Sequence, residues 1–289
     1  MAEKGSGGSS GGALDAESAA RRRFAELIER DEVPLAEAAL ALAEEEYPRL
    51  DTARYLAELD ALAAAALSRA GGRDAASMLR ALRTTLFGEE GFRGNDEAYY
   101  DPRNSFLNEV LERRLGIPIS LSIVYLEVAA RAGFSVRGVS FPGHFLVKHV
   151  APGGREVFVD PYRGGELLSA EDCAARHRAR THGRELDPRA LEAAPAPQIL
   201  ARMLHNLKRI YVDRRDDPRA LWVVDRLLLL NPRDAIERRD RGLVEARLGG
   251  ATAAAADLEA YLEAVPGADD ADEVRGVVAQ LRSRSRYVN

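Results

Sequence analysis

Cysteine is almost absent from this chain of 289 residues, in which Cys173 stands alone. A single cysteine excludes an intrachain disulfide and a zinc site built on several thiolates. Four of the five histidines, His149, His177, His182 and His205, lack the spacing to acidic residues that metal ligands show, and no glycine-rich phosphate loop appears. We therefore predict no metal, no cofactor and a reducing, cytoplasmic compartment.

An excess of positive charge and long hydrophobic runs are also missing. The formal net charge is −5, and arginine is interspersed with acidic residues along the chain. Such a balance creates no field that attracts phosphate backbones, so we expect no nucleic-acid partner. No run approaches the roughly 18 apolar residues of a membrane helix, and the first residues lack a signal peptide's apolar segment, so we expect no membrane partner. The oligomeric state stays open.

The residues that are abundant favour helices. Hydrophobic residues make up 46% and charged residues 30% of the chain, which is typical of a globular protein. Alanine and arginine are frequent and aromatic residues amount to 6%, a composition that favours α-helices. Glycine and serine fill most of positions 5–12, and we assign residues 1–15 to a flexible tail.

Residues 16–103 are predicted to form an N-terminal helical subdomain. Apolar residues recur three and four positions apart, most clearly at Leu35, Ala38 and Leu42. Either Asp51 or Thr52 is a suitable N-cap for a helix that runs to about residue 68. A further helix is expected over residues 74–87, followed by an irregular surface loop.

Residues 104–170 are predicted to form a compact core. An apolar helix is expected from Ser120 to Ala132, because Gly116 and Pro118 end the short helix before it. Three β-like runs follow at residues 135–141, 145–149 and 156–160. A small antiparallel sheet packed on the apolar helix gives an α+β fold that is predominantly α.

Residues 171–197 are polar and rich in arginine and proline, so we assign them to a connector. Residues 198–289 show a period of 34 between Pro232 and Pro266, the period of a tetratricopeptide repeat. Matching residues precede both prolines: Ala220, Val224 and Leu227 in the first copy, and Ala254, Leu258 and Tyr261 in the second. We predict tetratricopeptide-like repeats with a capping helix over residues 272–283. The alternative is a generic helical bundle.

Three residues are candidates for nucleophilic catalysis, which needs a nucleophile, a base and a group that orients the base. Ser120 is expected at a helix N-terminus, where backbone N–H groups stabilise a developing anion. His144 follows one strand and Asp160 ends another. If these strands are antiparallel neighbours, the imidazole meets the carboxylate, an arrangement typical of papain-like and transglutaminase-like folds.

Each candidate also has a plain structural interpretation. Ser120 is a suitable helix N-cap, His144 would hold the turn at Pro142 and Gly143, and Asp160 would cap the turn at Pro161. Asn104 is a helix cap or a hydrogen-bond donor to a bound carbonyl. The common order and placement of these residues favours a site.

The sequence resembles the SirB-type transglutaminase-like family in two stretches of the core, NSFLNEVLERRLGIPISLSIVYLEVAARAGFSVRGVSFPGHFLVKH and VDPYRGGELLS. The resemblance extends to EEEYPRLDTARYLAELDAL before them and to RMLHNLKRIY and RDRGLVEARLG after them, and so covers residues 33–266. It implies a transglutaminase-like core joined to tetratricopeptide-like repeats. In catalytically active relatives, cysteine stands at the position of Ser120, and an aromatic residue often stands at that of Leu146. His144 and Asp160 match the histidine and aspartate of the superfamily.

These observations support two functions. The first is a protein- or peptide-binding module, in which a degenerate catalytic cleft and the repeat face around Tyr211 and Trp222 bind a partner. The alternative is an acyl-transfer enzyme, either an amidase or peptidase or a transglutaminase-like protein. In that enzyme Ser120 attacks, His144 acts as general base and then acid, and Asp160 orients the histidine. Serine is the weaker choice, because its hydroxyl ionises far less readily than a thiol.

Overall fold

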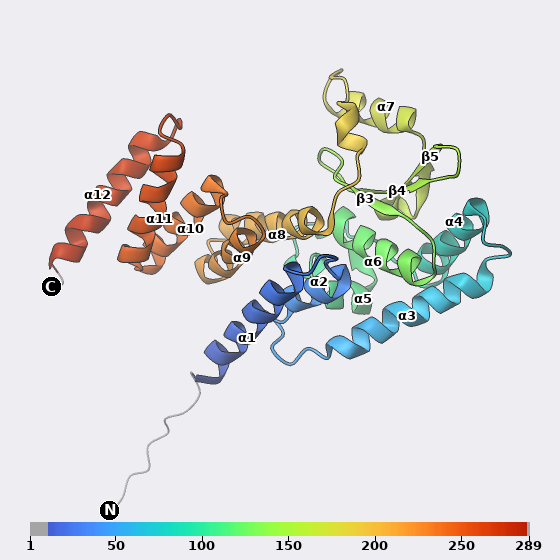
Figure 1. Ribbon diagram of the computed structural model, residues 1–289, viewed down its shortest axis with the longest axis horizontal. Coiled ribbons are helices and arrows are strands. Elements are labelled where there is room, and N and C mark those ends of the chain that lie inside the picture. Colours follow the sequence, from blue (N-terminus) through green and yellow to red (C-terminus); the bar gives the residue numbers. More distant parts are fainter. Residues whose placement is uncertain (1–10, 288–289) are drawn as a thin grey trace, which may run out of the picture. The chain divides into compact units, whose positions relative to one another are not determined.

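The computed structural model of the protein describes residues 11–287 and divides into two compact units (Figure 1). The first unit ends at Leu200 and the second begins at Ala201. The domain boundaries that composition suggests stay a prediction, and residues 1–10 of the predicted tail lie outside the described residues. Within residues 11–287, no helix has both the length and the apolar character needed to cross a membrane.

Helices form the N-terminal part of the first unit. They are α1 (Gly11–Ile28), α2 (Leu35–Ala43), α3 (Thr52–Arg69) and α4 (Ala75–Arg83), and α4 continues into a π-helix over Thr84–Glu89. The carboxylates of Asp51 and Asp74 cap α3 and α4 by accepting bonds from the N–H groups of Arg54 and Ser77. Helix α1 starts before the predicted residue 16, because alanine and leucine at positions 13 and 14 are strong helix formers.

Helix α6 (Pro118–Arg131) is the buried centre of the first unit. Eleven of its 14 residues are buried, as expected for a helix that is apolar on all sides. It contacts α2, α3, α4 and α5 (Leu107–Arg113) on the helical side, and two strands of the sheet on the other. The segment just before α6 forms a short strand, β2 (Leu115–Gly116), which pairs in parallel with β1 (Arg93–Gly94) from the loop before α5.

A four-stranded antiparallel sheet packs on α6. Its strands follow chain order as β3 (Arg137–Val139), β4 (Leu146–Val150), β5 (Glu156–Asp160) and β6 (Glu166–Leu168). Leu146, Phe158 and Leu168 form one apolar face together with Cys173 of α7 (Ala170–Arg180). Because side chains alternate along strands, Val147 and Val159 point to the opposite face. The predicted α+β fold is confirmed, although β6 was not predicted.

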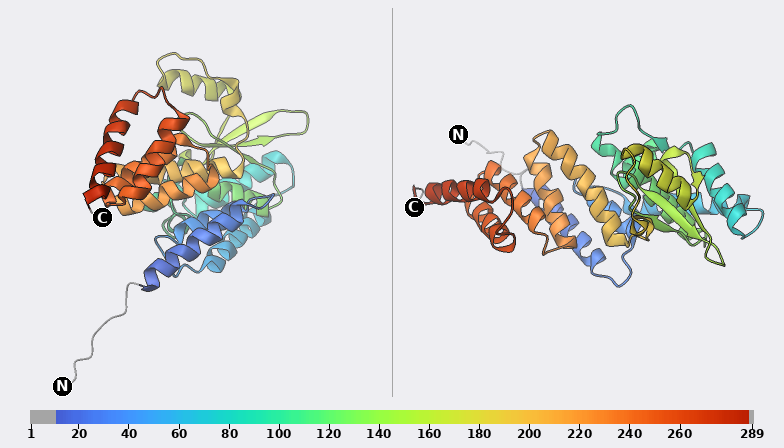
Figure 2. Two further views of the ribbon diagram at one scale, coloured as in Figure 1. Left: turned by 60° about the vertical axis from the view of Figure 1, so that its left-hand side comes forward. Right: turned by 90° about the horizontal axis from the view of Figure 1, so that it is seen from above.

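The second unit consists of successive antiparallel helices (Figure 2). They are α8 (Ala196–Asp213, whose larger part belongs to this unit), α9 (Asp217–Leu230), α10 (Ala235–Leu248), α11 (Ala251–Ala264) and α12 (Ala271–Tyr287). Helix α10 packs on α9 and α11, and α12 packs on α11 as the predicted cap. The tetratricopeptide-like repeats are thus confirmed, with Ala254, Leu258 and Tyr261 in the core between α11 and α12.

Ion pairs stabilise the second repeat where a charged residue replaces the apolar residue of the first repeat. Arg241 stands at the position that Leu207 occupies in the first repeat, and its guanidinium binds both carboxylate oxygens of Asp257. Glu237 accepts hydrogen bonds from His205 and Lys208. Burial alone would raise the pKa of the Glu237 carboxyl, but these two bonds bring the pKa below its usual value.

Gly242 lets α10 and α11 approach closely. A Cβ added there would lie 2.8 Å from Cγ of Leu258 and 3.1 Å from the carbonyl oxygen of Ala254. We expect Gly242→Ala to lower the free energy of unfolding of the repeat unit by about 1–3 kcal/mol, because overpacking forces the helices apart. Urea unfolding followed by the fluorescence of Trp222, the only tryptophan, measures this change.

The matched control is Gly276→Ala in α12. A Cβ at Gly276 would meet no atom within 4 Å among the residues that the structure describes. The free energy of unfolding of this variant should rise by up to about 1 kcal/mol, because alanine favours the helix. Equal effects of the two substitutions would contradict the close approach at Gly242.

Candidate functional site

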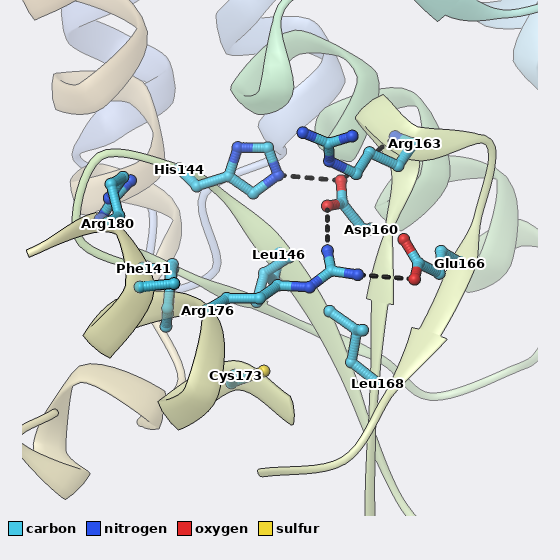
Figure 3. Close-up of a pocket in the computed structure, with 11 residues that line it drawn as sticks. Phe141, His144, Leu146, Asp160, Arg163, Glu166, Leu168, Cys173, Arg176 and Arg180 are labelled. Atoms are coloured by element: carbon cyan, nitrogen blue, oxygen red, sulfur yellow. Dashed lines mark hydrogen bonds and ion pairs between the residues drawn. The ribbon is translucent and has the colours of Figure 1, made fainter. Parts of the chain in front are cut away.

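His144 and Asp160 meet where two antiparallel strands bring distant parts of the chain together. The register of β4 and β5 pairs Val147 with Val159, so the loop before β4 lies beside the end of β5. Nε2 of His144 lies 2.9 Å from Oδ1 of Asp160 (Figure 3). Asp160 is 1% exposed and His144 is 20% exposed. The predicted contact between imidazole and carboxylate is therefore present.

Asp160 also binds two further segments. Its Oδ1 accepts a bond from the N–H of Arg163 at 3.3 Å, which caps the short helix Pro161–Arg163. Its Oδ2 lies 3.4 Å from Nη1 of Arg176 on α7, and Nη2 of Arg176 lies 2.6 Å from Oε1 of Glu166 (Figure 3). The hydrogen bond that Arg176 donates to Glu166 raises the pKa of Arg176 above its usual value, so this guanidinium stays charged. Asp160 both orients His144 and caps its own turn.

These residues line a cavity of about 650 Å³ on the face of the sheet that α7 covers (Figure 3). Its lining contains three arginines, Arg163, Arg176 and Arg180, and two carboxylates, those of Asp160 and Glu166. Its apolar part consists of Phe141, Leu146 and Leu168 together with Cys173 and Ala179. The cavity therefore offers positive charge next to an apolar surface.

Cys173 is the single thiol in this cavity, and it is buried. Burial raises the pKa of the thiol to about 11. At neutral pH the sulfur is protonated, and a protonated thiol is a poor nucleophile. Cys173 therefore contributes apolar surface to the cavity.

Ser120 lies apart from the lining of this cavity. Its hydroxyl donates to the main-chain carbonyl of Asn104 at 2.6 Å and accepts from the N–H of Ile117 at 3.0 Å. The side chain is 1% exposed, and a Cβ on Gly116 would lie 2.7 Å from its Oγ. Within residues 11–287, no hydrogen bond joins Ser120 to His144. The hydroxyl of Ser120 is thus used in hydrogen bonds to the main chain around the start of α6.

The side chain of Asn104 is fully buried and closes the preceding loop. Its amide donates to the carbonyls of Ala98 and Tyr99 at 2.7 and 3.2 Å. Its Oδ1 accepts from Asn95 at 3.0 Å and from Arg113 at 3.4 Å. Both amide hydrogens are therefore engaged with the main chain in this arrangement.

The two predicted binding residues of the repeats lie inside the second unit. Tyr211 is 3% exposed and Trp222 is 7% exposed, and their ring centroids are 6.4 Å apart. They pack α8 against α9 within the first repeat.

Sequence reasoning missed the polar residues that surround His144 and Asp160. Glu166 lies on β6, a strand of three residues, and Arg176 and Arg180 lie on α7, within the stretch that we assigned to a connector. One signal was available: Ser169 and Asp172 form a reciprocal capping box that marks the start of α7. The i, i+4 spacing of the two arginines then places them on one side of that helix.

Comparison with known proteins agrees with this architecture. Residues 53–205, just over half of the chain, match the transglutaminase-like superfamily, and residues 207–279 match a tetratricopeptide repeat family. A UPF0162 protein of Xylella fastidiosa is 39% identical over 259 residues, which cover 88% of this chain and 92% of that protein. The chain belongs to the UPF0162 family. A UPF0162 protein of Vibrio cholerae is 31% identical over 266 residues, covering 89% of this chain and 95% of that protein.

The similarity also reaches a eukaryotic protein. A stretch of 105 residues is 34% identical to F-box only protein 21 of Mus musculus, and it covers 33% of this chain and 16% of that protein. The chain thus shares this part with a protein of much greater length.

We expect Ser120→Ala to lower the free energy of unfolding of the first unit by about 1–2 kcal/mol, because it leaves the buried N–H of Ile117 without its acceptor. Ser122→Ala is the matched control, since Oγ of Ser122 is buried without a hydrogen-bond partner in the described structure. Removal of the Ser122 hydroxyl should leave the free energy of unfolding unchanged or raise it slightly. Calorimetric melting of both variants measures the difference, and similar melting temperatures would contradict a structural role for the Ser120 hydroxyl.

Proposed function

We propose that this chain is a protein- or peptide-binding module whose transglutaminase-like cavity has lost its nucleophile. The observation that carries the proposal is the 2.6 Å hydrogen bond from the Ser120 hydroxyl to the carbonyl of Asn104. A serine acts as a nucleophile only when a base accepts its proton in a preorganised site. In this arrangement a main-chain carbonyl, which is no base, takes that place.

The lining of the cavity supports a particular kind of ligand. Arg163 and Arg180 carry positive charge beside the apolar side chains of Phe141, Leu146 and Leu168. Guanidinium groups recognise carboxylates with charge-assisted hydrogen bonds, and apolar pockets hold side chains of a bound peptide. We infer that the cavity binds a peptide segment in which a carboxylate lies next to an apolar residue.

The repeats supply the second binding surface in this proposal. Tetratricopeptide-type repeats form extended surfaces that suit polypeptide partners. Because Tyr211 and Trp222 are buried, we infer that they fix the shape of the repeat surface from beneath. Asn104 would act on the first unit in the same indirect way, by holding the loop before α5. We further assign the chain to the SirB-type group that its sequence resembles, and to the cytoplasm on the grounds of its cysteine content.

A second candidate function is acyl transfer, as an amidase, peptidase or transglutaminase-like reaction. The contact between His144 and Asp160 favours it, because Asp160 accepts from Nε2 and so leaves Nδ1 of the imidazole free to take a proton. Ser120 would have to leave Asn104 and turn towards His144 before attacking a substrate carbonyl. The imidazole would then accept the hydroxyl proton and return it to the leaving group.

A fluorophosphonate probe separates the two functions. We expect no covalent labelling of the wild-type chain, because the Ser120 hydroxyl is buried and bonded to the main chain. Labelling that disappears in both Ser120→Ala and His144→Ala would establish the enzyme and overturn the binding module.

A peptide-display selection on the whole protein tests the ligand. We expect enrichment of peptides that combine an acidic and an apolar residue, with binding kept in Ser120→Ala and weakened about tenfold or more in Arg180→Glu. Arg184→Glu is the matched control, because it makes the same charge change at an exposed position outside the cavity lining. Equal loss in the two arginine variants would exclude the cavity as the binding site.

A further inference from the structure

A second cavity, of about 480 Å³, lies between α4 and the face of the sheet opposite α7. We propose that it binds a small organic phosphate, with the phosphate group held by arginines and the apolar part of the molecule held against the sheet. Its lining consists of Ala75, Ala76, Leu79, Arg80 and Arg83 from the α4 side, and His149, Ala151, Arg155, Val157 and Leu167 from the sheet. The volume is within the usual range for small-molecule sites.

This cavity is separate from the one that contains His144. Val157 and Leu167 alternate along their strands with Phe158 and Leu168, which belong to the apolar cluster on the α7 side. Neighbouring residues of a strand point to opposite faces of a sheet. The proposal therefore does not depend on Ser120 or on the function of the first cavity.

The charge of the lining points to an anion. Three arginines line the cavity, and no aspartate or glutamate does. Among the side chains that the structure describes, no carboxylate oxygen lies within 4.0 Å of the guanidinium nitrogens of Arg80, Arg83 or Arg155. Arg176 in the first cavity differs, because Glu166 and Asp160 already neutralise it. Three guanidinium groups without carboxylate partners match the double negative charge of a phosphate monoester better than the single charge of a carboxylate.

His149 provides an independent sign of a missing partner. The residue is 8% exposed, its Nδ1 lies 2.9 Å from the carbonyl oxygen of Ser135, and its ring stacks on Phe134 at 4.5 Å. Nδ1 therefore donates its hydrogen to that carbonyl, which orients the ring. Nε2 is buried and has no hydrogen-bond partner among the described residues. Buried polar atoms are rarely left unpaired, and a phosphate oxygen that shares a proton with Nε2 would supply the partner.

The apolar part of the lining suits the body of the same ligand. Leu79 is buried and Val157 is partly covered, whereas Leu167 is 49% exposed. An aromatic or aliphatic group bound beside the arginines would cover this surface. The cavity therefore offers both surfaces that an amphiphilic anion needs, arginines for its charge and an apolar surface for its body.

Titration calorimetry of the whole protein with 1-naphthyl phosphate tests the proposal, with 1-naphthoate and inorganic phosphate as comparison ligands. We expect binding of 1-naphthyl phosphate that is at least about tenfold tighter than either comparison ligand and that weakens as salt is added. Equal affinity for 1-naphthoate would overturn the assignment to phosphate. Equal affinity for inorganic phosphate would overturn the role of the apolar surface.

Two variants locate the site, and a third serves as the control. Arg83→Gln and Arg155→Gln change exposed side chains and should each weaken binding of 1-naphthyl phosphate about tenfold. Arg184→Gln removes one exposed arginine outside the lining and should leave the affinity unchanged. Absence of binding to the wild-type protein, or the same loss in all three variants, would overturn the proposal.

Discussion

The first cavity depends on the hydrogen bonds and the ion pair that the buried carboxylate of Asp160 accepts. Burying a charged carboxylate is costly unless hydrogen bonds and opposite charges surround it. Asp160 is 1% exposed, and its donors come from the loop of His144, from the turn at Arg163 and from Arg176 on α7. Three segments are therefore held together at Asp160. The imidazole of His144 is oriented because the buried carboxylate needs hydrogen-bond donors.

A similar demand determines the position of Ser120. Main-chain groups in the turn before α6 and in the loop before α5 need partners, and the hydroxyl supplies one for the N–H of Ile117 and one for the carbonyl of Asn104. Gly116 leaves room for the oxygen, since a Cβ there would lie 2.7 Å away. The chain thus brings His144 and Asp160 together while its serine satisfies the backbone. This combination supports the binding function that we propose.

The alternation of side chains across the sheet separates the two cavities. On the α7 side, Arg176 is paired with Asp160 and Glu166 next to apolar side chains of the lining. On the α4 side, arginines stand without acidic neighbours in the lining. One small sheet therefore presents two surfaces of different charge, and we assign a peptide to the first and a small phosphate to the second.

The sequence alone determined the features that arise within a few residues or from a fixed period. Local hydrogen bonds determine the helix starts at Asp51 and Asp74. Periodicity determines the apolar helix α6 and the repeat spacing of Pro232 and Pro266. The meeting of His144 with Asp160 could be predicted too, because adjacent antiparallel strands leave few other arrangements. Only the tertiary structure decided that β6 and α7 complete the cavity, that the Ser120 hydroxyl binds Asn104, and that Tyr211 and Trp222 are buried. Those outcomes depend on which distant groups compete for each hydrogen bond and each piece of apolar surface, and that competition is settled by packing across the whole unit.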